Sequence, residues 1–454
     1  MLSSMPPRKA KITLSDYSYR RDIENRILMS QLSVFEVNVL HEIIHHSLSL
    51  SIEQLAKDLE ITVDRLSPIL DKLDSLKLFK RQGLTLIVDK EMRKYFEFQI
   101  EKFDDHFEPN LDFLQNVLNR VPIHVLPLWY AIPRSSDNIF ASIIEKYFST
   151  PKIYLQYLNE LQFDNPILNA IIKDVYHAPQ FKVTAAELIE KYGLTRESFE
   201  EYLLLLEYHF ACCLSYNRRN GDWEEVVTPF SELREYLQFE VQTKPHPIQE
   251  PVESTYYIDF NFIHDLTTLL QVCQSKKIHM KDVKNLRAET PLQRQAILAK
   301  LIQVGFAKQN AAGQLMATEK GNLWLLKSFP EQVNNLSSDP LNKPANIAEF
   351  STLWNVRNLH LIEKNLRRLV PNEWVEFHHF LKGFIVPIGD KEPIMLTNKG
   401  KKWKYVLPSY TNHEKQFIQT VIMERLAELG VVNTGLYQGK PCFCLTSFGN
   451  RFIQ

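Results

Sequence analysis

The chain has 454 residues, 44% of them hydrophobic and 11% aromatic, which is typical of globular domains and excludes an extended disordered protein; at this length we expect three or four domains. Its 13 glycines are under half of the usual usage of about 7%. The phosphate-binding motifs G-x-G-x-x-G and G-x-x-x-x-G-K-[ST] do not occur. Because turns that bind phosphate need glycine, both observations argue against a nucleotide-binding enzyme. The net charge of −1 becomes informative only when it is divided along the chain.

The first residues carry Arg8, Lys9 and Lys11 but no apolar segment, so we expect no secretory signal there. No stretch approaches the roughly 18 apolar residues that cross a membrane. The five cysteines are few and odd in number, which suits a reducing compartment without a disulfide framework. We therefore expect a cytoplasmic protein, with a nuclear location as the alternative.

The first predicted unit contains three helices and a hairpin. Apolar residues at helical spacing follow a serine cap in Ser33–His46, a short second helix begins after Ser51, and a third follows Thr62. The β-rich stretch 84–88 and a helix from Asp89 come next. This is the element order of winged helix-turn-helix domains, and SIEQLAKDLEITVDRLSPILDKLDSLKLFKRQG resembles that superfamily. The resemblance implies a domain that binds nucleic acid or protein.

The same order recurs near the middle of the chain. Ile167–Tyr176 is the expected first helix, and VTAAELIEKYGLTRESFEEYLLLLEYHF predicts two helices joined by a turn at Gly193. Asn220-Gly221 marks the hairpin. Between these two units, residues 104–163 predict helices that fit no winged unit, so we expect a connecting helical domain.

Two further units are expected in the C-terminal half. Residues 257–330 predict helices over Ile258–Cys273, Met280–Leu286 and Leu292–Val304, followed by a strand-turn-strand segment. The last region begins with a helix over Trp354–Leu369 and ends with another helix and hairpin.

Short internal matches support the repeat hypothesis. The blocks ILAKLIQVGFAKQ (297–309) and IMERLAELGVVNT (422–434) align without gaps. A Thr, a Gly three residues later and an aromatic residue six after the Thr also recur; we expect the Thr to cap a helix and the aromatic residue to pack on the core. The three sets are Thr318, Gly321 and Trp324; Thr397, Gly400 and Trp403; and Thr446, Gly449 and Phe452.

These features predict a mainly α protein with small β-hairpin wings, built as tandem winged helix-turn-helix units plus a connecting helical domain. Proline-bearing stretches supply the linkers. The expected segments are a basic N-terminal arm (1–30), winged units (31–103, 166–240, 256–330 and 347–454), the connecting domain (104–165) and two linkers (241–255 and 331–346).

The sequence from His41 to His45 reads H-E-I-I-H, the pattern of zinc peptidases, in which the histidines share a helix face and Glu42 is the general base. No third ligand is evident, because Ser51 stands where the extended pattern needs histidine. Solvated polar residues beside a buried apolar stripe explain the pattern equally completely. We therefore expect no enzyme, no catalytic residue, no metal and no cofactor, with a zinc peptidase as the distant third hypothesis.

Two other arrangements of possible ligands are incomplete. Cys442 and Cys444 would lie on one side of a strand, and His209 and Cys212 stand three residues apart. Neither pair has further ligands at a suitable spacing. We expect Cys442 and Cys444 to be buried small residues rather than a zinc site.

Charge is unevenly distributed along the chain. Residues 187–240 carry a net charge of −7, whereas residues 273–327 carry +7 and residues 354–404 carry +5. Such asymmetry indicates a nucleic-acid partner for the basic half. In the acidic second unit the third helix would present Glu200 and its neighbours to DNA and repel it.

Basic residues of the third and fourth units are the candidate phosphate contacts. Lysines surround Trp403 in KGKKWKY, and Lys300 is expected on the outward face of a third helix. The repeat predicts a buried Trp403, which disfavours base stacking by it; ordinary solvated lysines are the alternative for each cluster. The candidate residues are Lys276, Lys277, Lys281, Lys284, Arg287, Lys300, Arg367, Arg368, Lys399, Lys401, Lys402 and Lys404.

The leading hypothesis is a transcription- or chromosome-related protein that holds the backbone of double-stranded DNA with little sequence readout. Its acidic N-terminal half would contact a protein partner or self-associate. The alternative is a structural subunit of a larger assembly that uses winged helices for protein contacts. Neither a membrane nor a small-molecule substrate is expected.

Overall fold

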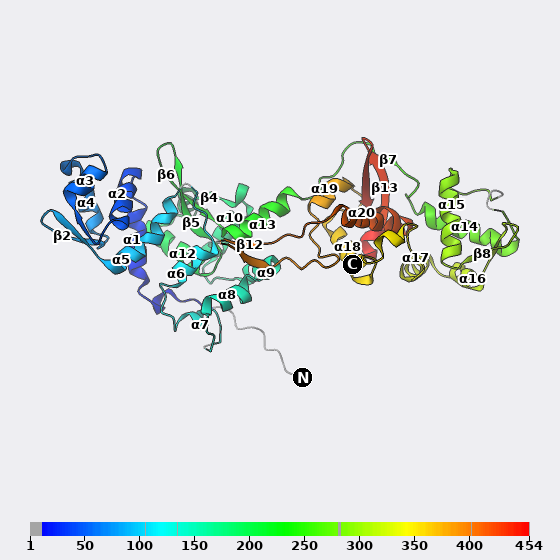
Figure 1. The fold of residues 1–454 in the computed structure, drawn as a ribbon, viewed down its shortest axis with the longest axis horizontal. Helices are drawn as coiled ribbons and strands as arrows, with labels where there is room; N and C mark the ends of the chain where they lie inside the picture. Colours follow the sequence, from blue (N-terminus) through cyan, green and yellow to red (C-terminus); the bar gives the residue numbers. More distant parts are fainter. Residues whose placement is uncertain (1–10, 105, 134, 280–282, 401, 454) are drawn as a thin grey trace. The chain divides into compact units, whose positions relative to one another are not determined.

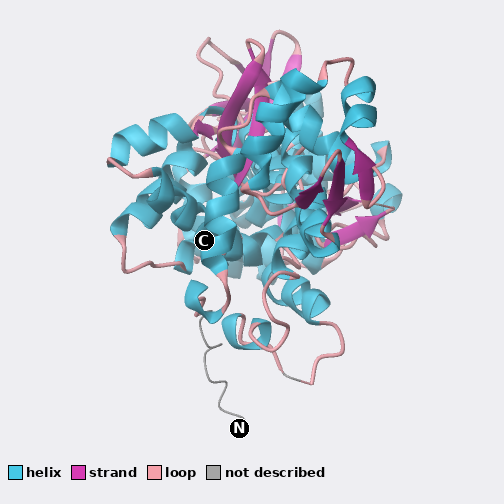
Figure 2. Cartoon of the chain, turned by 90° about the vertical axis from the view of Figure 1, so that its left-hand side faces the viewer, coloured by secondary structure: helices cyan, strands magenta, loops and turns pink. Residues whose placement is uncertain are grey.

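The computed structural model describes residues 11–104, 106–133, 135–279, 283–400 and 402–453. Helices dominate, and the strands form small antiparallel sheets of two to four strands (Figure 1; Figure 2). The expected mainly α class with small β elements is therefore confirmed. Within the described residues, no helix is both long and apolar enough to cross a membrane.

The chain divides into two compact units, each with its own core. The N-unit comprises the residues up to Gln238 together with Met395–Val406, and the C-unit comprises Phe239–Ile394 together with the residues from Leu407 onward. The short segment 395–406 thus belongs to the N-unit, although the sequence on both sides of it belongs to the C-unit.

The first of the four segments expected to be winged units, each called a repeat from here on, lies in the N-unit and follows the predicted order of elements. Ser33 and Glu36 form a reciprocal capping box at the start of the first helix. The strand after this helix pairs with the last strand of the hairpin, so that buried Leu50 lies opposite buried Leu86. The elements are α2 (Val34–His45), β1 (Ser49–Ser51), α3 (Ile52–Asp58), α4 (Val63–Asp74), β2 (Phe79–Gln82), β3 (Thr85–Val88) and then α5 (Lys90–Ile100).

The second repeat has the same order and the same strand pairing. Thr184 and Thr195 cap its second and third helices, and Gly193 between them has a φ of 59°, which glycine favours. Its sheet order, β4-β6-β5, matches the order β1-β3-β2 of the first repeat. The elements are α10 (Pro166–His177), β4 (Val183–Thr184), α11 (Ala185–Tyr192), α12 (Arg196–Tyr208), β5 (Cys213–Arg219), β6 (Asp222–Thr228) and then α13 (Ser231–Gln242).

The third repeat, in the C-unit, differs from the expectation at its second helix. Of the predicted helix Met280–Leu286, residues 280–282 lie outside the described residues and residues 283–286 are not helical. The buried carboxylate of Asp265 instead accepts hydrogen bonds from the next backbone N–H groups, those of Arg287 and Ala288, at 2.8 Å each. Its elements are α14 (Asn261–Ser275), a bridge from Ile278 to Leu315, α15 (Pro291–Gln303), β8 (Ala307–Gln309) and β9 (Leu315–Ala317).

The fourth repeat contains an insertion between its second and third helices. Segment 395–406 lies within this insertion. The third helix begins as α20 and continues as a π-helical segment, Val421–Leu426. The first strand again pairs with the last, and β7, which lies in a segment expected to be a linker, adds to the sheet. The elements are α18 (Val356–Asn365), β10 (Trp374–Glu376), α19 (Phe377–Lys382), α20 (Asn412–Thr420), β13 (Val432–Tyr437), β14 (Lys440–Leu445) and β7 (Glu253–Ser254).

Two of the three predicted Thr-Gly-aromatic sets form helix caps. The Thr318 and Thr446 hydroxyls accept hydrogen bonds from the N–H groups of Gly321 and Gly449. Both glycines lie so close to the carbonyl of the residue just before the preceding hairpin, Phe306 or Val431, that a Cβ would clash with it. The third set, which begins at Thr397, is wrong, because it lies in a β-hairpin and caps no helix.

Helices also occupy segments that were expected to be an arm and a linker. α1 (Tyr19–Met29) lies within residues 1–30, and its buried Ile23 and Arg26 make it part of the folded N-unit. α17 (Phe329–Ser338) lies across the start of the expected linker 331–346 and packs into the core of the C-unit. The remaining helices are α6 (Leu111–Leu118), α7 (Leu126–Trp129), α8 (Ile139–Tyr147), α9 (Pro151–Glu160), α16 (Glu319–Leu325) and α21 (Ser447–Phe452).

Candidate nucleic-acid interface

The segment KGKKWKY forms the turn and second strand of a two-stranded hairpin. Strands β11 (Leu396–Lys399) and β12 (Lys402–Tyr405) pair in an antiparallel register, and Gly400 adopts a φ of 75° in the turn. Alternation along β12 leaves Trp403 half-buried rather than buried as the repeat predicted.

The base of this hairpin is fixed to the N-unit by hydrogen bonds. The Leu396 N–H donates to the Ser149 carbonyl at 2.9 Å, and the buried Tyr405 hydroxyl donates to the Phe148 carbonyl at 2.9 Å. The Tyr405 ring also packs edge-on against Tyr236. The hairpin therefore presents its turn from an anchored base.

Lysines are concentrated at the other end of the hairpin. Lys399 and Lys402 lie directly opposite each other and are exposed, an arrangement of like charges that destabilises a strand pair. Neither has a carboxylate partner among the described residues, whereas Lys404 lies 3.9 Å from Glu235. Lys401 lies outside the described residues. Anionic phosphate at the turn would relieve the repulsion between the two lysines.

A second exposed basic segment lies in the third repeat. Lys276, Lys277 and Lys284 are exposed and form no ion pair within the described part of the chain; Lys281 lies outside it. Arg287 is also exposed, but its guanidinium donates to the Asn261 side chain at 2.7 Å and holds the local loop. Three lysines of this cluster thus remain available for phosphate.

The prediction that Lys300 faces outward is wrong. The Lys300 side chain is 6% exposed, and its ammonium lies 2.8 Å from a Glu428 oxygen. It also donates to the Asn342 side chain at 2.9 Å and to the Lys343 carbonyl at 3.0 Å. These partners satisfy the buried charge, and they remove Lys300 from any nucleic-acid surface.

Two predicted arginines donate hydrogen bonds to backbone carbonyls, although Arg367 remains exposed. Arg367 donates through two guanidinium nitrogens to the Ile453 carbonyl, at 3.0 and 2.6 Å. Arg368 donates to the carbonyls of Thr243 and Gly383. Both side chains therefore secure the C-unit.

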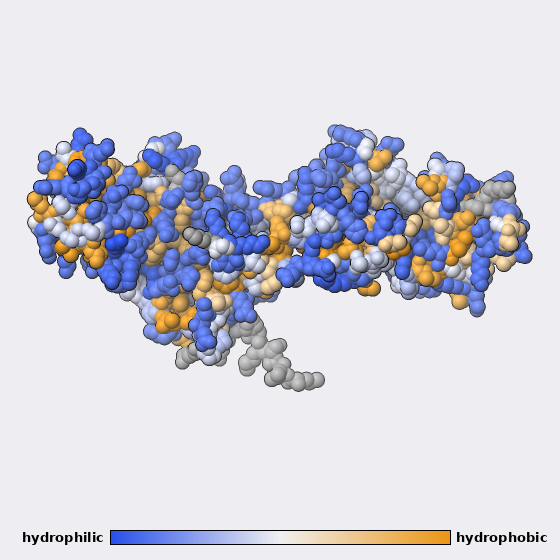
Figure 3. All heavy atoms as spheres, in the orientation of Figure 1, coloured by the Kyte–Doolittle hydropathy of each residue, from blue (hydrophilic) through white to orange (hydrophobic). Residues whose placement is uncertain are grey.

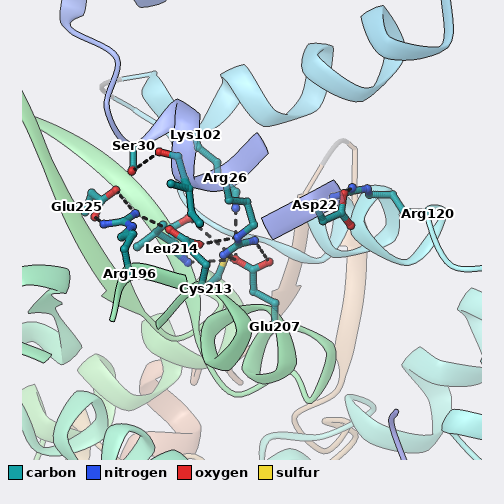
Figure 4. A network of polar contacts seen from close by, with 12 residues as sticks. Asp22, Arg26, Ser30, Lys102, Arg120, Arg196, Glu207, Cys213, Leu214 and Glu225 are labelled. Atoms are coloured by element: carbon teal, nitrogen blue, oxygen red, sulfur yellow. Dashed lines mark hydrogen bonds and ion pairs between the residues drawn. The ribbon is translucent and has the colours of Figure 1, made fainter. Parts of the chain in front are cut away.

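The acidic third helix of the second repeat turns its central carboxylates inward, contrary to the expectation that Glu200 would repel DNA. Arg26 contacts Glu200 at 2.7 Å and Glu207 at 2.8 Å, and Lys102 reaches Glu207 at 3.3 Å (Figure 4). Burial would raise the pKa of Glu207, but the charges of Arg26 and Lys102 outweigh it and lower that pKa to about 2. Arg196 pairs with Glu200 and Glu225 on the other side of this network.

The H-E-x-x-H pattern lies on the outer face of α2. His41 and His45 are exposed and their rings stack at 4.1 Å, while Ile43 and Ile44 are buried. Among the described residues, no group of three or more His, Cys, Asp or Glu side chains could hold a metal ion. The two rings therefore lie side by side, with a Glu42 oxygen 3.9 Å from His41 Nδ1.

The cysteines are buried free thiols. Cys442 and Cys444 lie in β14, as expected of small residues in a strand of the core, and burial raises the pKa of both to about 11. Thiols with raised pKa values are poor metal ligands and poor nucleophiles.

Sequence reasoning missed Arg425, which is equivalent to Lys300 in the gap-free alignment of the third and fourth repeats. Its guanidinium is buried and lies 2.6 Å from Glu363. The alignment itself was the signal, because a basic residue at the same position in both repeats indicates a shared environment.

In comparisons with known proteins, the chain matches no family model and no curated protein sequence.

Proposed function

We propose that this chain is an array of four winged helix-turn-helix repeats that binds the phosphate backbone of double-stranded DNA. The element order and strand pairing of the four repeats support the winged-helix interpretation. The basic hairpin β11–β12 is the principal contact, and the Lys276, Lys277 and Lys284 cluster is the second.

The observation that carries this proposal is the cross-strand pair of Lys399 and Lys402. Both are exposed, lie at the turn of an anchored hairpin and lack a carboxylate partner in the described chain. Two positive charges held side by side attract successive phosphates, and this attraction carries no sequence information.

The third helices favour backbone binding over base readout. In winged-helix and related domains, bases are read by side chains of this helix. In the third and fourth repeats, however, Lys300 and Arg425 face inward and pair with carboxylates. In the second repeat, Glu200 is likewise buried.

Binding is tested with the full chain and a fluorescent 30-base-pair duplex at low salt. We expect the Lys399→Glu/Lys402→Glu variant to bind at least tenfold more weakly than the unmodified protein. The matched control is Lys152→Glu/Lys173→Glu, which has the same net charge change at exposed positions of α9 and α10 and should bind as the unmodified protein does. Equal binding by the two variants would contradict the proposal.

A structural role in an assembly is the second candidate. Leu323 on α16 and Leu326, which directly follows this helix, are 57% and 83% exposed, which is the kind of apolar surface that a protein partner covers. Apolar side chains are otherwise scattered among polar ones on the face that Figure 3 shows. No measurable binding to duplex DNA, together with specific capture of a partner that Leu326→Glu abolishes, would favour this candidate.

A further inference from the structure

The N-unit contains a pocket of about 740 Å³ that no sequence motif indicated. Its walls come from the end of α8, from α9, from residues 161–165 after α9 and from the C-terminal end of α12. Residues 11–13 contribute to the lining. The volume falls in the range of roughly 300–1,000 Å³ that is typical of small-molecule sites.

Aromatic and aliphatic side chains make up much of the pocket surface. Tyr147 and Tyr157 pack edge to face with ring centroids 4.8 Å apart, and Phe163, Leu168 and Leu205 also line the space. Such a surface favours the binding of ligands that bury apolar area against it.

Four charged side chains line the pocket, and three of them, Lys11, Glu160 and Asp164, are exposed. The Lys146 ammonium donates to the carbonyls of Tyr130 and Ala131 at 2.8 and 3.0 Å, and burial lowers its pKa. Glu160 accepts a hydrogen bond from Gln156 at 2.9 Å. Lys146 and Glu160 are thus held by hydrogen bonds to neutral groups of the protein.

The buried His209 contributes a polar but uncharged group. Its Nδ1 lies 3.3 Å from the Tyr157 hydroxyl, and its ring packs edge-on against Phe163. Burial lowers the pKa of His209 to about 4, so the ring is neutral near pH 7. A charged ligand in contact with it would gain no compensating charge.

The irregular wall after α9 is held in place. The Asn169 side chain accepts from the Phe163 N–H at 3.3 Å and donates to the Phe163 carbonyl at 3.0 Å. Asn165, which caps α10, donates to the Tyr202 hydroxyl at 2.7 Å. These bonds order the pocket wall before a ligand binds, so that binding costs little conformational entropy of the protein.

We propose that this pocket binds one uncharged small molecule with an aromatic or otherwise largely apolar body. The site is separate from the basic hairpin and goes beyond nucleic-acid binding. It also departs from the expectation that the protein has no small-molecule ligand. The aromatic and aliphatic walls make shape and apolar contact the means of recognition.

The test is a fluorescence titration of the full chain with the neutral probe N-phenyl-1-naphthylamine and the anionic probe 8-anilinonaphthalene-1-sulfonate. We expect the neutral probe to saturate at one molecule per chain and to bind at least tenfold more tightly than the anionic probe. Unsaturable binding, or an anionic probe that binds as tightly, would overturn the proposal.

Two variants locate the neutral probe. Leu205→Trp fills the pocket from within and should abolish binding. Ile153→Arg places a charge on a lining side chain that is 39% exposed, and its matched control is Ile123→Arg, at an exposed position outside the pocket. We expect Ile153→Arg to weaken binding at least fivefold and Ile123→Arg to leave it unchanged. Equal binding by the two arginine variants would place the probe elsewhere and contradict the proposal, even if Leu205→Trp does not fold.

Discussion

Lys300 in α15 and Arg425 in the π-helical segment occupy equivalent positions of two repeats, and both place a buried positive charge against a carboxylate. The Lys300 ammonium lies 2.8 Å from Glu428, and the Arg425 guanidinium lies 2.6 Å from Glu363. The third helices of these repeats therefore use their basic residues to hold the C-unit together. In the proposed binding mode, side chains outside these helices therefore contact the nucleic acid.

Removal of the Lys300 charge should destabilise the C-unit. Lys300→Met leaves the Glu428 carboxylate without its partner in a buried site, which costs about 3 kcal/mol of unfolding free energy. Urea denaturation measures the change. The control is Lys308→Met at an exposed position, for which we expect less than about 0.5 kcal/mol. Equal effects of the two substitutions would show that the buried pair contributes nothing.

Removal of Arg26 should destabilise the N-unit in the same way. Arg26→Met would leave both Glu200 and Glu207 without the guanidinium that joins them, at a cost of about 4 kcal/mol. The matched control is Arg20→Met, at an exposed position of the same helix. Thermal unfolding of both variants checks the prediction, which fails if Arg26→Met unfolds at the temperature of the control.

Glu232 should make the N-unit less stable as the pH rises. Burial raises the pKa of this carboxyl to about 7 from an ordinary value of 4.5, so the folded state holds a proton that the unfolded state has released. The protonated Glu232 carboxyl therefore contributes to the free energy of unfolding fully below pH 4.5. This contribution, about 3 kcal/mol, is lost as the pH rises through about 7. Unfolding free energies at pH 5 and pH 8 measure this loss.

The Glu232→Gln variant isolates this group from the other titrating residues. Glutamine cannot ionise, so the difference in stability between pH 5 and pH 8 should shrink by most of the predicted change. Glu197→Gln on the exposed face of α12 should keep the pH dependence of the unmodified protein. An unaltered pH dependence in Glu232→Gln would mean that the carboxyl titrates normally.

The Tyr405 hydroxyl should anchor the basic hairpin. Tyr405→Phe removes its hydrogen bond to the Phe148 carbonyl and leaves that buried acceptor unpaired, at a cost of about 1–2 kcal/mol. Hydrogen exchange at the β11–β12 amides should accelerate while exchange in the C-unit stays unchanged. Unchanged exchange in the hairpin would show that other contacts fix its position.

Local patterns predicted most of the helices and hairpins correctly. Ser33 caps a helix that begins where the sequence indicated, and the helix predicted over Leu292–Val304 is present as Pro291–Gln303. This success has a local cause, because a cap and an apolar stripe act within a few residues of each other. Residues 283–286, predicted to be helical, are not, and the loop that follows them is held from a distance, because Asp265 in α14 accepts hydrogen bonds from the Arg287 and Ala288 N–H groups.

Long-range packing explains the errors in the candidate site. The helical pattern placed Lys300 on the outward face of its helix, but Asn342 and Glu428, far along the chain, satisfy its charge in the interior. Thr397 belongs to a set with the same residue types as the caps at Thr318 and Thr446, yet Gly400 in that set serves a hairpin turn. The bond between Tyr405 and Phe148 joins residues 257 positions apart, which no local pattern reveals.

The salt dependence of DNA binding tests the central claim most directly. Each phosphate contact contributes about 0.9 to the slope of log binding constant against log salt. Replacement of Lys399 and Lys402 by glutamine should therefore reduce the magnitude of that slope by about 2, while the Lys152→Gln/Lys173→Gln control keeps the slope of the unmodified protein. The same slope in all three proteins, or no binding to duplex DNA at low salt, would contradict the assignment of the hairpin as a phosphate-binding element.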